Sequence, residues 1–450
     1  MAYTDFIAAL YLGTSRITGI VGKKEAGLIT VIAYETENSA NCIHRGCVYN
    51  VKETANKAKE IIRRLEAKSP GSRIGKVYIG VGGQSIRSVK HSVSKSFETE
   101  CMITDELKDS LLDDCKTYQP EGLDVLSVIP STYDLDKRPA LDPVGISCSL
   151  IEANYQLIVA RPSIRKRIEE MGKLAKIEIA GILPSPLVLA DVVLSEDEKK
   201  RGCALIDFGA GVTSLSLYKN GCLLGLWVIP LGGNLITKDL ADYLGIRETA
   251  VERLKRDYGN AIVNKDELTT FQVDVEPAER ATVRLADFNT VIEARMQEIL
   301  ENVYDRLETV GLKELRAGIV ITGKTANLEN LTTLIYNRLK PDIQDVRYAC
   351  IREDLVIKAK QSNLEPDGIT LGLLLEGKIN CVEQTLPPIA PPLVQTPIVQ
   401  TPPPAAAPPP TPPPAEEKAQ PESSGRTPKK QKGRIGNKVS GFLGDLFKEQ

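Results

Sequence analysis

The sequence predicts an α/β fold built from a duplicated unit and followed by a long linker and a terminal amphipathic helix. Two stretches far apart in the chain share one plan: a strand, a glycine turn and two more strands. Helical patterns follow the strands in each stretch, and the composition becomes proline-rich after residue 383. Strand meanders with covering helices are typical of α/β layers with a cleft between two halves.

Length and composition restrict the class of protein. The 450 residues are three times the roughly 150 expected of one domain, so we expect two or more domains. The 57 Lys and Arg residues nearly balance 59 Asp and Glu residues, which argues against a generally basic nucleic-acid binder. No run approaches the roughly 20 apolar residues of a membrane-spanning helix. Asp5 stands where a secretory signal would carry positive charge. The nine cysteines have no C-x-x-C spacing, which fits free thiols, so we expect a cytosolic chain.

The first copy of the unit begins near the N-terminus. Residues 6–12 read as a buried strand, Gly13, Thr14 and Ser15 as a tight turn, and residues 16–21 and 28–34 as the next strands. A helical pattern covers residues 51–65. Residues 77–157 carry strand signals at 77–81 and 125–129 and a helix signal at 103–112, which suggests an inserted subdomain.

The second copy repeats this plan. Residues 203–206 read as a strand that ends at Asp207, residues 208–211 as a turn, and residues 212–218 and 222–229 as strands joined by an Asn220-Gly221 hairpin turn. Helices are expected at 236–244 and 247–258, with Gly245 and Gly259 as C-terminal caps. Residues 291–310 have an apolar stripe at helical spacing, which we interpret as core packing of a long helix closed by Gly311.

The two glycine turns are the candidate ligand site. A glycine turn placed directly after a buried strand exposes backbone N–H groups that can cradle phosphate oxygens. One such turn would more often be an ordinary hairpin, but two at equivalent places of a duplicated unit predict hairpins that grip one polyphosphate from opposite sides. Asp207 could hold Mg²⁺ through water, the alternative being a turn-capping aspartate.

Several segments together resemble the FtsA family of bacterial cell-division proteins, within the superfamily of actin, sugar kinases and heat-shock chaperone ATPases. They are residues 9–22 and 204–217 as phosphate loops, 229–240 as a connecting segment, 291–295, 318–328 as the adenosine loop, and 368–377. The resemblance implies an actin-like two-lobed fold of duplicated ribonuclease-H-like domains with an FtsA-type inserted subdomain that contains residues 142–145.

The resemblance also implies domain boundaries. The first lobe would comprise 1–84, 163–200 and 367–383, with the inserted subdomain at 85–162. The second lobe would comprise 201–232, 233–310 and 311–366. A disordered proline-rich linker at 384–432 and an amphipathic membrane-targeting helix at 433–450 would follow.

The cofactors implied are ATP and Mg²⁺. By resemblance the nucleotide site would consist of Gly13, Thr14, Ser15, Asp207, Gly209, Ala210, Gly211, Thr213, Gly232, Gly233, Glu252, Lys255, Gly323 and Thr325. Glu252 and Lys255 would lie at the ribose and adenine, the alternative being an i,i+3 surface ion pair. Asp207 would hold the metal.

Three residues depart from the family pattern. Tyr11 replaces an acidic residue near the metal, Val212 replaces a threonine, and Lys324 interrupts a Gly-Gly pair in the adenosine loop. Loss of a carboxylate weakens metal positioning, on which phosphoryl transfer depends. We therefore expect ATP binding with at most slow hydrolysis. Lys324 could contact phosphate or ribose, or could point into solvent.

The C-terminal region is predicted to be a linker and a membrane anchor. Sixteen of the 28 prolines fall between residues 387 and 428, and an extended polyproline path over residues 387–432 would reach roughly 140 Å. In residues 433–450 the apolar positions lie within an arc of about 140° of a helix. They are Ile435, Val439, Phe442, Leu443, Leu446 and Phe447. Basic residues at the start of this helix suit an anionic membrane surface, although a protein groove would accept the same apolar face.

The function implied by the resemblance is a filament-forming adaptor that links the tubulin-like protein FtsZ to the inner membrane at the division septum. The partners would be the FtsZ C-terminal tail, further copies of the chain, anionic lipids and other division proteins, with no nucleic acid. Arg295 matches a position associated with FtsZ and could pair with an acidic peptide, or could be a solvated helix charge. The alternatives are a sugar or small-molecule kinase, for which no catalytic carboxylate is evident, and a pilus-assembly actin homologue, in which the linker and tail would be unexpected.

Overall fold

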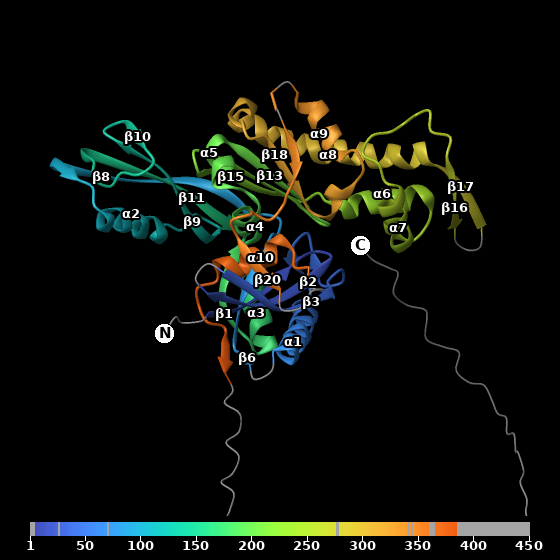
Figure 1. The fold of residues 1–450 in the computed structure, drawn as a ribbon, viewed down its shortest axis with the longest axis horizontal. Helices are drawn as coiled ribbons and strands as arrows, with labels where there is room; N and C mark the ends of the chain where they lie inside the picture. The colour runs from blue at the N-terminus through green and yellow to red at the C-terminus, as the bar shows by residue number, and fades with distance from the viewer. Residues whose placement is uncertain are drawn as a thin grey trace, which may run out of the picture. The chain divides into compact units, whose positions relative to one another are not determined.

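The computed structural model describes residues 5–25, 28–69, 72–275, 279–340, 342–343, 345–359 and 365–384. These residues belong to one compact unit, Met1–Ile389 (Figure 1). The expected membrane helix and nearly all of the expected linker lie outside the described residues. Within the described residues no helix is long and apolar enough to cross a membrane. All nine cysteines are free thiols, as their spacing predicts.

The first lobe is built on a six-stranded sheet in the order β12-β7-β1-β2-β3-β20. Strands β1, β2 and β3 form an antiparallel meander, whereas β7, β12 and β20 pair in parallel. The strands are β1 (Asp5–Leu12), β2 (Arg16–Glu25), β3 (Leu28–Asn38), β7 (Lys76–Val81), β12 (Glu178–Pro184) and β20 (Val356–Ala359).

Helices cover both faces of this sheet. A Cβ atom on Gly19 would meet Ile61 of α1 (Val51–Lys68), and one on Gly22 would meet Leu374 of α10 (Gly368–Glu376). Since alternate strand residues point to opposite faces, α1 and α10 lie on opposite sides of β2. Helix α3 (Pro162–Ala175) packs beside α1, and α4 (Ser185–Val193) packs beside α10.

The second lobe and the inserted subdomain share a nine-stranded sheet in the order β10-β9-β11-β8-β15-β14-β13-β18-β19. The second-lobe strands are β13 (Cys203–Phe208), β14 (Thr213–Lys219), β15 (Cys222–Ile229), β18 (Ile319–Thr322) and β19 (Val346–Tyr348). The insert provides β8 (Arg87–Met102), β9 (Asp124–Leu135), β10 (Arg138–Ala140) and β11 (Ser147–Ala160), with helix α2 (Asp105–Thr117). The insert also has its own buried cluster, centred on Tyr155.

Four helices accompany the second-lobe strands: α6 (Gly233–Leu244), α7 (Glu248–Tyr258), α8 (Leu285–Val310) and α9 (Leu331–Leu339). The apolar stripe of α8 is buried in the second-lobe core, as the spacing predicts. The smaller elements are β4 (Ile43–His44), β5 (Cys47–Val48), β6 (Ser72–Ile74), α5 (Glu196–Arg201), β16 (Thr270–Val275), β17 (Glu279–Arg284), η1 (Leu312–Glu314), η2 (Lys324–Asn327) and β21 (Val382–Gln384).

The duplicated strand plan is confirmed, with three differences in detail. Helix α8 begins at Leu285 rather than at 291. The apolar pattern did not indicate this first part, because it contains polar residues such as Asn289, which is nevertheless buried. The strand signal at 77–81 belongs to the first-lobe sheet as β7, paired with β1, and not to the insert. Strand β20 pairs with β3 of the first lobe, although the resemblance implies that 311–366 belong to the second.

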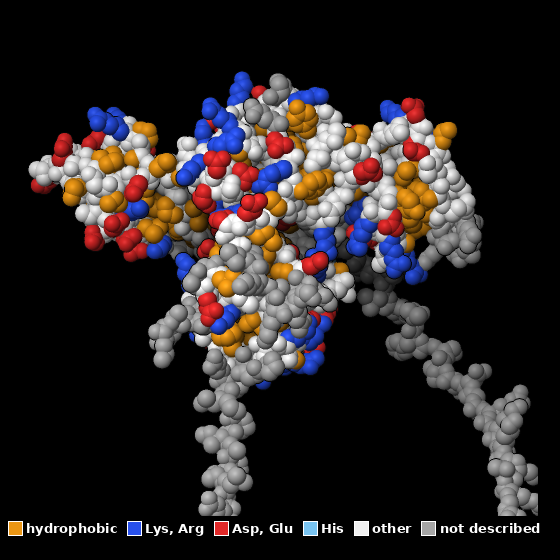
Figure 2. Space-filling model, in the orientation of Figure 1, with side chains coloured by type: hydrophobic (Ala, Val, Ile, Leu, Met, Phe, Trp, Pro, Cys, Tyr) orange, Lys and Arg blue, Asp and Glu red, His pale blue; other side chains and the backbone are white. Residues whose placement is uncertain are grey.

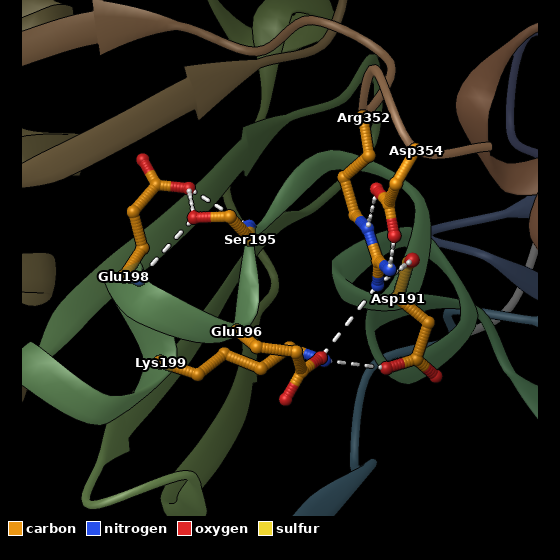
Figure 3. Close-up of polar contacts among 7 residues, drawn as sticks. All are labelled: Asp191, Ser195, Glu196, Glu198, Lys199, Arg352 and Asp354. Atoms are coloured by element: carbon orange, nitrogen blue, oxygen red, sulfur yellow. Dashed lines mark hydrogen bonds and ion pairs between the residues drawn. The ribbon is translucent and has the colours of Figure 1, made fainter.

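A cluster of charged side chains joins the two passages of the chain between the lobes (Figure 3). Arg352, in the segment that leads to β20, donates to the carbonyl oxygen of Asp191 on α4 at 3.1 Å and pairs with Asp354. Its backbone N–H donates to the Val192 carbonyl at 2.9 Å. Lys199 of α5, which is buried, donates to the Asp191 carboxylate at 2.9 Å. The outgoing and returning segments are therefore tied together at one place.

Replacing Arg352 by alanine tests this cluster. We expect Arg352→Ala to destabilise the protein by about 1–3 kcal/mol, because the hydrogen bond to a half-buried carbonyl is lost. Arg63→Ala, which removes an exposed i,i+3 pair with Glu60, should cost at most about 1 kcal/mol. Urea unfolding of the full chain measures both, and equal losses in the two variants would contradict a special role for Arg352.

Candidate nucleotide-binding site

The first glycine turn joins β1 to β2 and has no space for a side chain at Gly13. The Gly13 N–H donates to the Arg16 carbonyl at 3.1 Å, and a Cβ atom on Gly13 would lie 2.9 Å from that oxygen. The buried Ser39 hydroxyl donates to the Gly13 carbonyl at 2.6 Å. The Thr14 hydroxyl accepts from the Gly46 N–H at 2.8 Å. The turn is therefore fixed by residues outside the hairpin.

The second glycine turn joins β13 to β14 and contacts the first. The Gly209 N–H donates to the Val212 carbonyl at 3.0 Å, which closes the turn. A Cβ atom on Gly211 would lie 2.5 Å from Oγ1 of Thr14. Because only glycine allows this approach, the two turns, distant in the chain, face each other directly.

The start of α6 is bonded to the second turn. The Gly233 N–H donates to the Gly209 carbonyl at 3.0 Å, and the Asn234 N–H donates to the Ala210 carbonyl at 2.8 Å. A Cβ atom on Gly232 would lie 2.7 Å from the Ala210 carbonyl oxygen. Gly232, Gly233 and the phosphate-loop candidates thus form one continuous backbone structure.

The segment after β18 lies against the same turn. Gly323 has a φ of 90°, and a Cβ atom there would lie 2.5 Å from Oδ1 of Asp207. Thr325 is buried and its hydroxyl donates to the Gly209 carbonyl at 3.2 Å. Thr213 is buried as well and donates to the Leu231 carbonyl at 2.9 Å. Both hydroxyls therefore position backbone in this structure, and Gly323 and Asp207 line the site.

Glu252 and Lys255 form a buried contact between α7 and α6. The Lys255 ammonium donates to the Gly233 carbonyl at 3.0 Å and to the Thr237 hydroxyl at 2.7 Å, and it pairs with Glu252 at 2.6 Å. Burial lowers the pKa of Lys255. Burial also acts to raise the pKa of Glu252, but hydrogen bonds from Lys255 and Thr237 outweigh it and hold that pKa below its usual value. A surface ion pair does not describe this contact, because Lys255 is only 7% exposed.

The pKa values of Tyr11 and Asp207 are raised at the bottom of the site, and the charge of Asp367 contributes to both shifts. Asp207 is half-buried, and burial together with the charge of Asp367 raises its pKa to about 6. Burial and the charges of Asp207 and Asp367 raise the pKa of Tyr11 far above its usual value. No described residue donates a hydrogen bond to the Asp207 carboxylate or forms an ion pair with it. A partly buried carboxylate without a partner fits a hydrated divalent cation.

Sequence reasoning missed Asp367. This residue caps the N-terminus of α10: its carboxylate accepts from the Thr370 N–H at 2.9 Å and from the Tyr34 hydroxyl at 3.2 Å. The sequence signal was an aspartate directly before the segment 368–377. Asp367 thus supplies a negative charge close to Asp207 and Tyr11.

Cationic side chains also surround the site. Burial lowers the pKa of Lys324, and the charges of Arg16 and Arg256 act in the same direction. The charges of Asp367 and Glu252 oppose them. Although much of the Lys324 side chain is exposed, its ammonium group is close enough to interact with these four charges. Figure 2 shows further Lys and Arg side chains gathered over the region of α6 and α7. The site thus has carboxylates at its bottom and cationic side chains around its edge, an arrangement that suits a polyphosphate and its metal ion.

Two glycine turns that face each other between two sheets of the same plan define an actin-like protein. In agreement, the chain resembles the solved structure of a PilM-PilN type IV pilus biogenesis complex with a TM-score of 0.56 at 16% identity, over 82% of this chain and 97% of that one. At this identity the likeness shows the fold.

Sequence comparison identifies the family. The family model described as cell division protein FtsA matches residues 204–358, and the SHS2 domain inserted in FtsA matches residues 83–159. Cell division protein FtsA of Porphyromonas gingivalis is 32% identical over 388 residues, which cover 84% of this chain and 79% of that protein. FtsA of Bacillus subtilis is 28% identical over 351 residues, 76% of this chain and 79% of that protein. The chain belongs to the FtsA family of cell division proteins.

The raised pKa of Asp207 predicts a pH-dependent stability. Because its pKa in the folded protein, about 6, exceeds that of an unfolded aspartate, the folded state binds the proton more tightly. This contribution to stability is present below about pH 4 and is lost as the pH rises through 6. Asp207→Asn should therefore melt at a higher temperature than wild type at pH 7.5, and the difference should shrink toward pH 4. The exposed control Asp113→Asn should not change the profile, and a wild-type profile for Asp207→Asn would contradict the pKa assignment.

Proposed function

We propose that this FtsA-family chain is an ATP-binding adaptor that assembles into filaments, binds the C-terminal tail of FtsZ and holds it at the cytoplasmic face of the inner membrane. The observation that carries the nucleotide part is the contact between the turns at Thr14 and Gly211. A triphosphate bound beside this contact, along the N–H groups of both turns, would touch both lobes, so its presence would bias their relative arrangement.

The residues suited to the nucleotide are mainly backbone groups. The N–H groups of residues 14, 15, 210 and 211 would bind the phosphates, whereas Gly13 and Gly209, whose N–H groups close the turns, would leave room beside them. Asp207 would hold Mg²⁺ through water, and the metal would neutralise phosphate charge. Gly232, Gly233, Thr213 and Thr325 would position these groups. Glu252, Lys255 and Gly323 would lie toward the ribose and adenine.

Hydrolysis would be slow at most. Tyr11 occupies the end of β1 beside Asp207, and its phenol, whose pKa is raised by burial, stays protonated and supplies no charge to a metal. Asp367 is engaged as a helix cap. Since phosphoryl transfer depends on positioning of metal and water, a single free carboxylate favours binding over turnover.

A titration of the full chain with ATP tests the nucleotide part. With Mg²⁺ we expect saturable binding, and Asp207→Asn should weaken it by roughly tenfold or more, because a charge-assisted contact is lost. Without Mg²⁺ the two proteins should bind ATP with similar affinity. Asp113→Asn is the control for a charge change outside the site. Unchanged Mg²⁺-dependent affinity of Asp207→Asn would remove the metal assignment.

Arg295 on α8 is a suitable contact for the acidic FtsZ tail. Its guanidinium donates to both carboxylate oxygens of Asp239 on α6, at 2.5 and 3.0 Å, and also pairs with Glu298. The side chain is held in one orientation while remaining about a quarter exposed. A pre-oriented guanidinium loses less freedom when it binds a further carboxylate.

The membrane part rests on the sequence of residues 433–450, which place six apolar residues on one helical face after a basic cluster. Four glycines, Gly433, Gly436, Gly441 and Gly444, weaken the helix, so one copy would bind reversibly. Filament assembly would align many copies and convert weak anchors into firm attachment. The linker would let each anchor reach the membrane.

A sedimentation experiment tests the adaptor as a whole. A fluorescent FtsZ tail peptide should pellet with anionic liposomes only in the presence of the full chain. Deletion of residues 433–450 should leave peptide binding in solution intact and abolish pelleting of both components. Arg295→Glu should abolish pelleting of the peptide but not of the chain, whereas Arg338→Glu, a charge reversal elsewhere on the second lobe, should change neither. Pelleting of the peptide with the truncated chain would contradict the proposal.

A further inference from the structure

A cavity of about 200 Å³ lies where the inserted subdomain meets the second lobe. Its walls come from three elements: Arg87 at the start of β8, Trp227 and Pro230 at the end of β15, and Asn302 and Arg306 on α8. None of the nucleotide-site candidates and no partner of Arg295 lines it. The cavity is therefore a separate place in the fold.

The polar wall of the cavity is cationic and lacks partners. No acidic residue that the structure describes lines the cavity. Within the part of the chain that the structure describes, neither Arg87 nor Arg306 forms an ion pair. Among the described residues, the Arg87 guanidinium has only a long contact of 3.5 Å with the Ser85 carbonyl. Two exposed guanidinium groups without a carboxylate favour a ligand that carries carboxylates.

Part of the cavity wall is apolar. A Cβ atom on Gly225 would lie 2.1 Å from the indole ring of Trp227, so the glycine permits the ring to lie along the strand. Val228 and Ile229 complete this wall and are buried. Small-molecule pockets usually enclose about 300–1,000 Å³. The smaller volume here suits one or two amino-acid side chains rather than a whole cofactor.

The cavity lies at the junction of the insert. Strand β8 pairs with β15 at the single position Trp227–Arg87, beside a hydrogen bond of 3.1 Å from the Val228 N–H to the Ile86 carbonyl. Ser85, with a φ of 88°, accepts a hydrogen bond from the Arg161 N–H at 3.2 Å. The chain thus enters and leaves the insert next to this cavity, and a ligand there would contact both the insert and the second lobe.

We propose that this cavity binds an acidic peptide segment of a partner protein, with one apolar side chain against Trp227 and carboxylates on Arg87 and Arg306. Tryptophan and arginine are the residues most enriched at the energetic centres of interfaces. The charge complementarity and the size of the cavity both support this occupant. This binding site goes beyond the proposed function and does not depend on nucleotide or FtsZ.

The sequence contains one tryptophan, so fluorescence excited selectively at tryptophan rather than at the 14 tyrosines reports on Trp227 in this cavity. The probe is a synthetic pentapeptide with a central leucine flanked by two glutamates on each side. We expect a saturable change in Trp227 emission that weakens at high salt. Arg306→Glu should weaken binding at least tenfold, whereas Arg316→Glu, the same charge reversal outside the cavity, should change it less than twofold.

Two altered peptides and one further variant complete the test. Replacing the leucine by serine, or the glutamates by glutamines, should each remove most of the affinity. Arg295→Glu should leave the affinity unchanged, which separates this cavity from the proposed FtsZ contact. Absence of binding, equal binding of the serine peptide, or equal losses in Arg306→Glu and Arg316→Glu would overturn the proposal. So would an emission change that depends on protein concentration without peptide, because the cavity would then be a contact between copies.

Discussion

The close approach of two backbone turns is the constraint on which this structure depends. Gly211 and Thr14 come from different lobes, and there is no space between them for even a methyl group. Such an approach requires each turn to be fixed by hydrogen bonds to residues outside it. Ser39 and Gly46 hold the first turn, and the start of α6 with Thr325 holds the second. Many buried polar residues of the site therefore serve to orient backbone.

The electrostatics of the site follow from the same closeness. Bringing Asp207 and Asp367 into a partly desolvated space raises the pKa of Asp207, which is a cost in stability at neutral pH. A cation bound at Asp207, as proposed above, would offset this electrostatic cost. Proteins commonly accept reduced stability at functional sites for this reason. The phenol of Tyr11, whose pKa is raised by burial, adds no further charge to this space.

Local patterns were sufficient to predict the repeated strands, the glycine turns and most helices. Alternation, turn residues and helical spacing are short-range properties, and the Asn220-Gly221 turn has positive φ at both residues, as its sequence indicates. Long-range contacts were not predictable in this way. The partner of Lys255 on α6, the charge of Asp367 beside Asp207, and the place of β7 in the first-lobe sheet depend on residues distant in sequence. The start of α8 was missed because Asn289 is polar but buried, where it accepts a hydrogen bond from the Asn260 N–H.

The charged cluster around Arg352 has a mechanical consequence. Both passages of the chain between the lobes are fastened together there, through Asp191 and Val192 on one side and the segment before β20 on the other. The lobes also share one buried apolar cluster, in which Leu205 and Val228 of the second lobe pack with residues of the first-lobe sheet. The Arg352 contacts therefore add polar bonds beside this apolar contact, and separation of the two segments would have to break both.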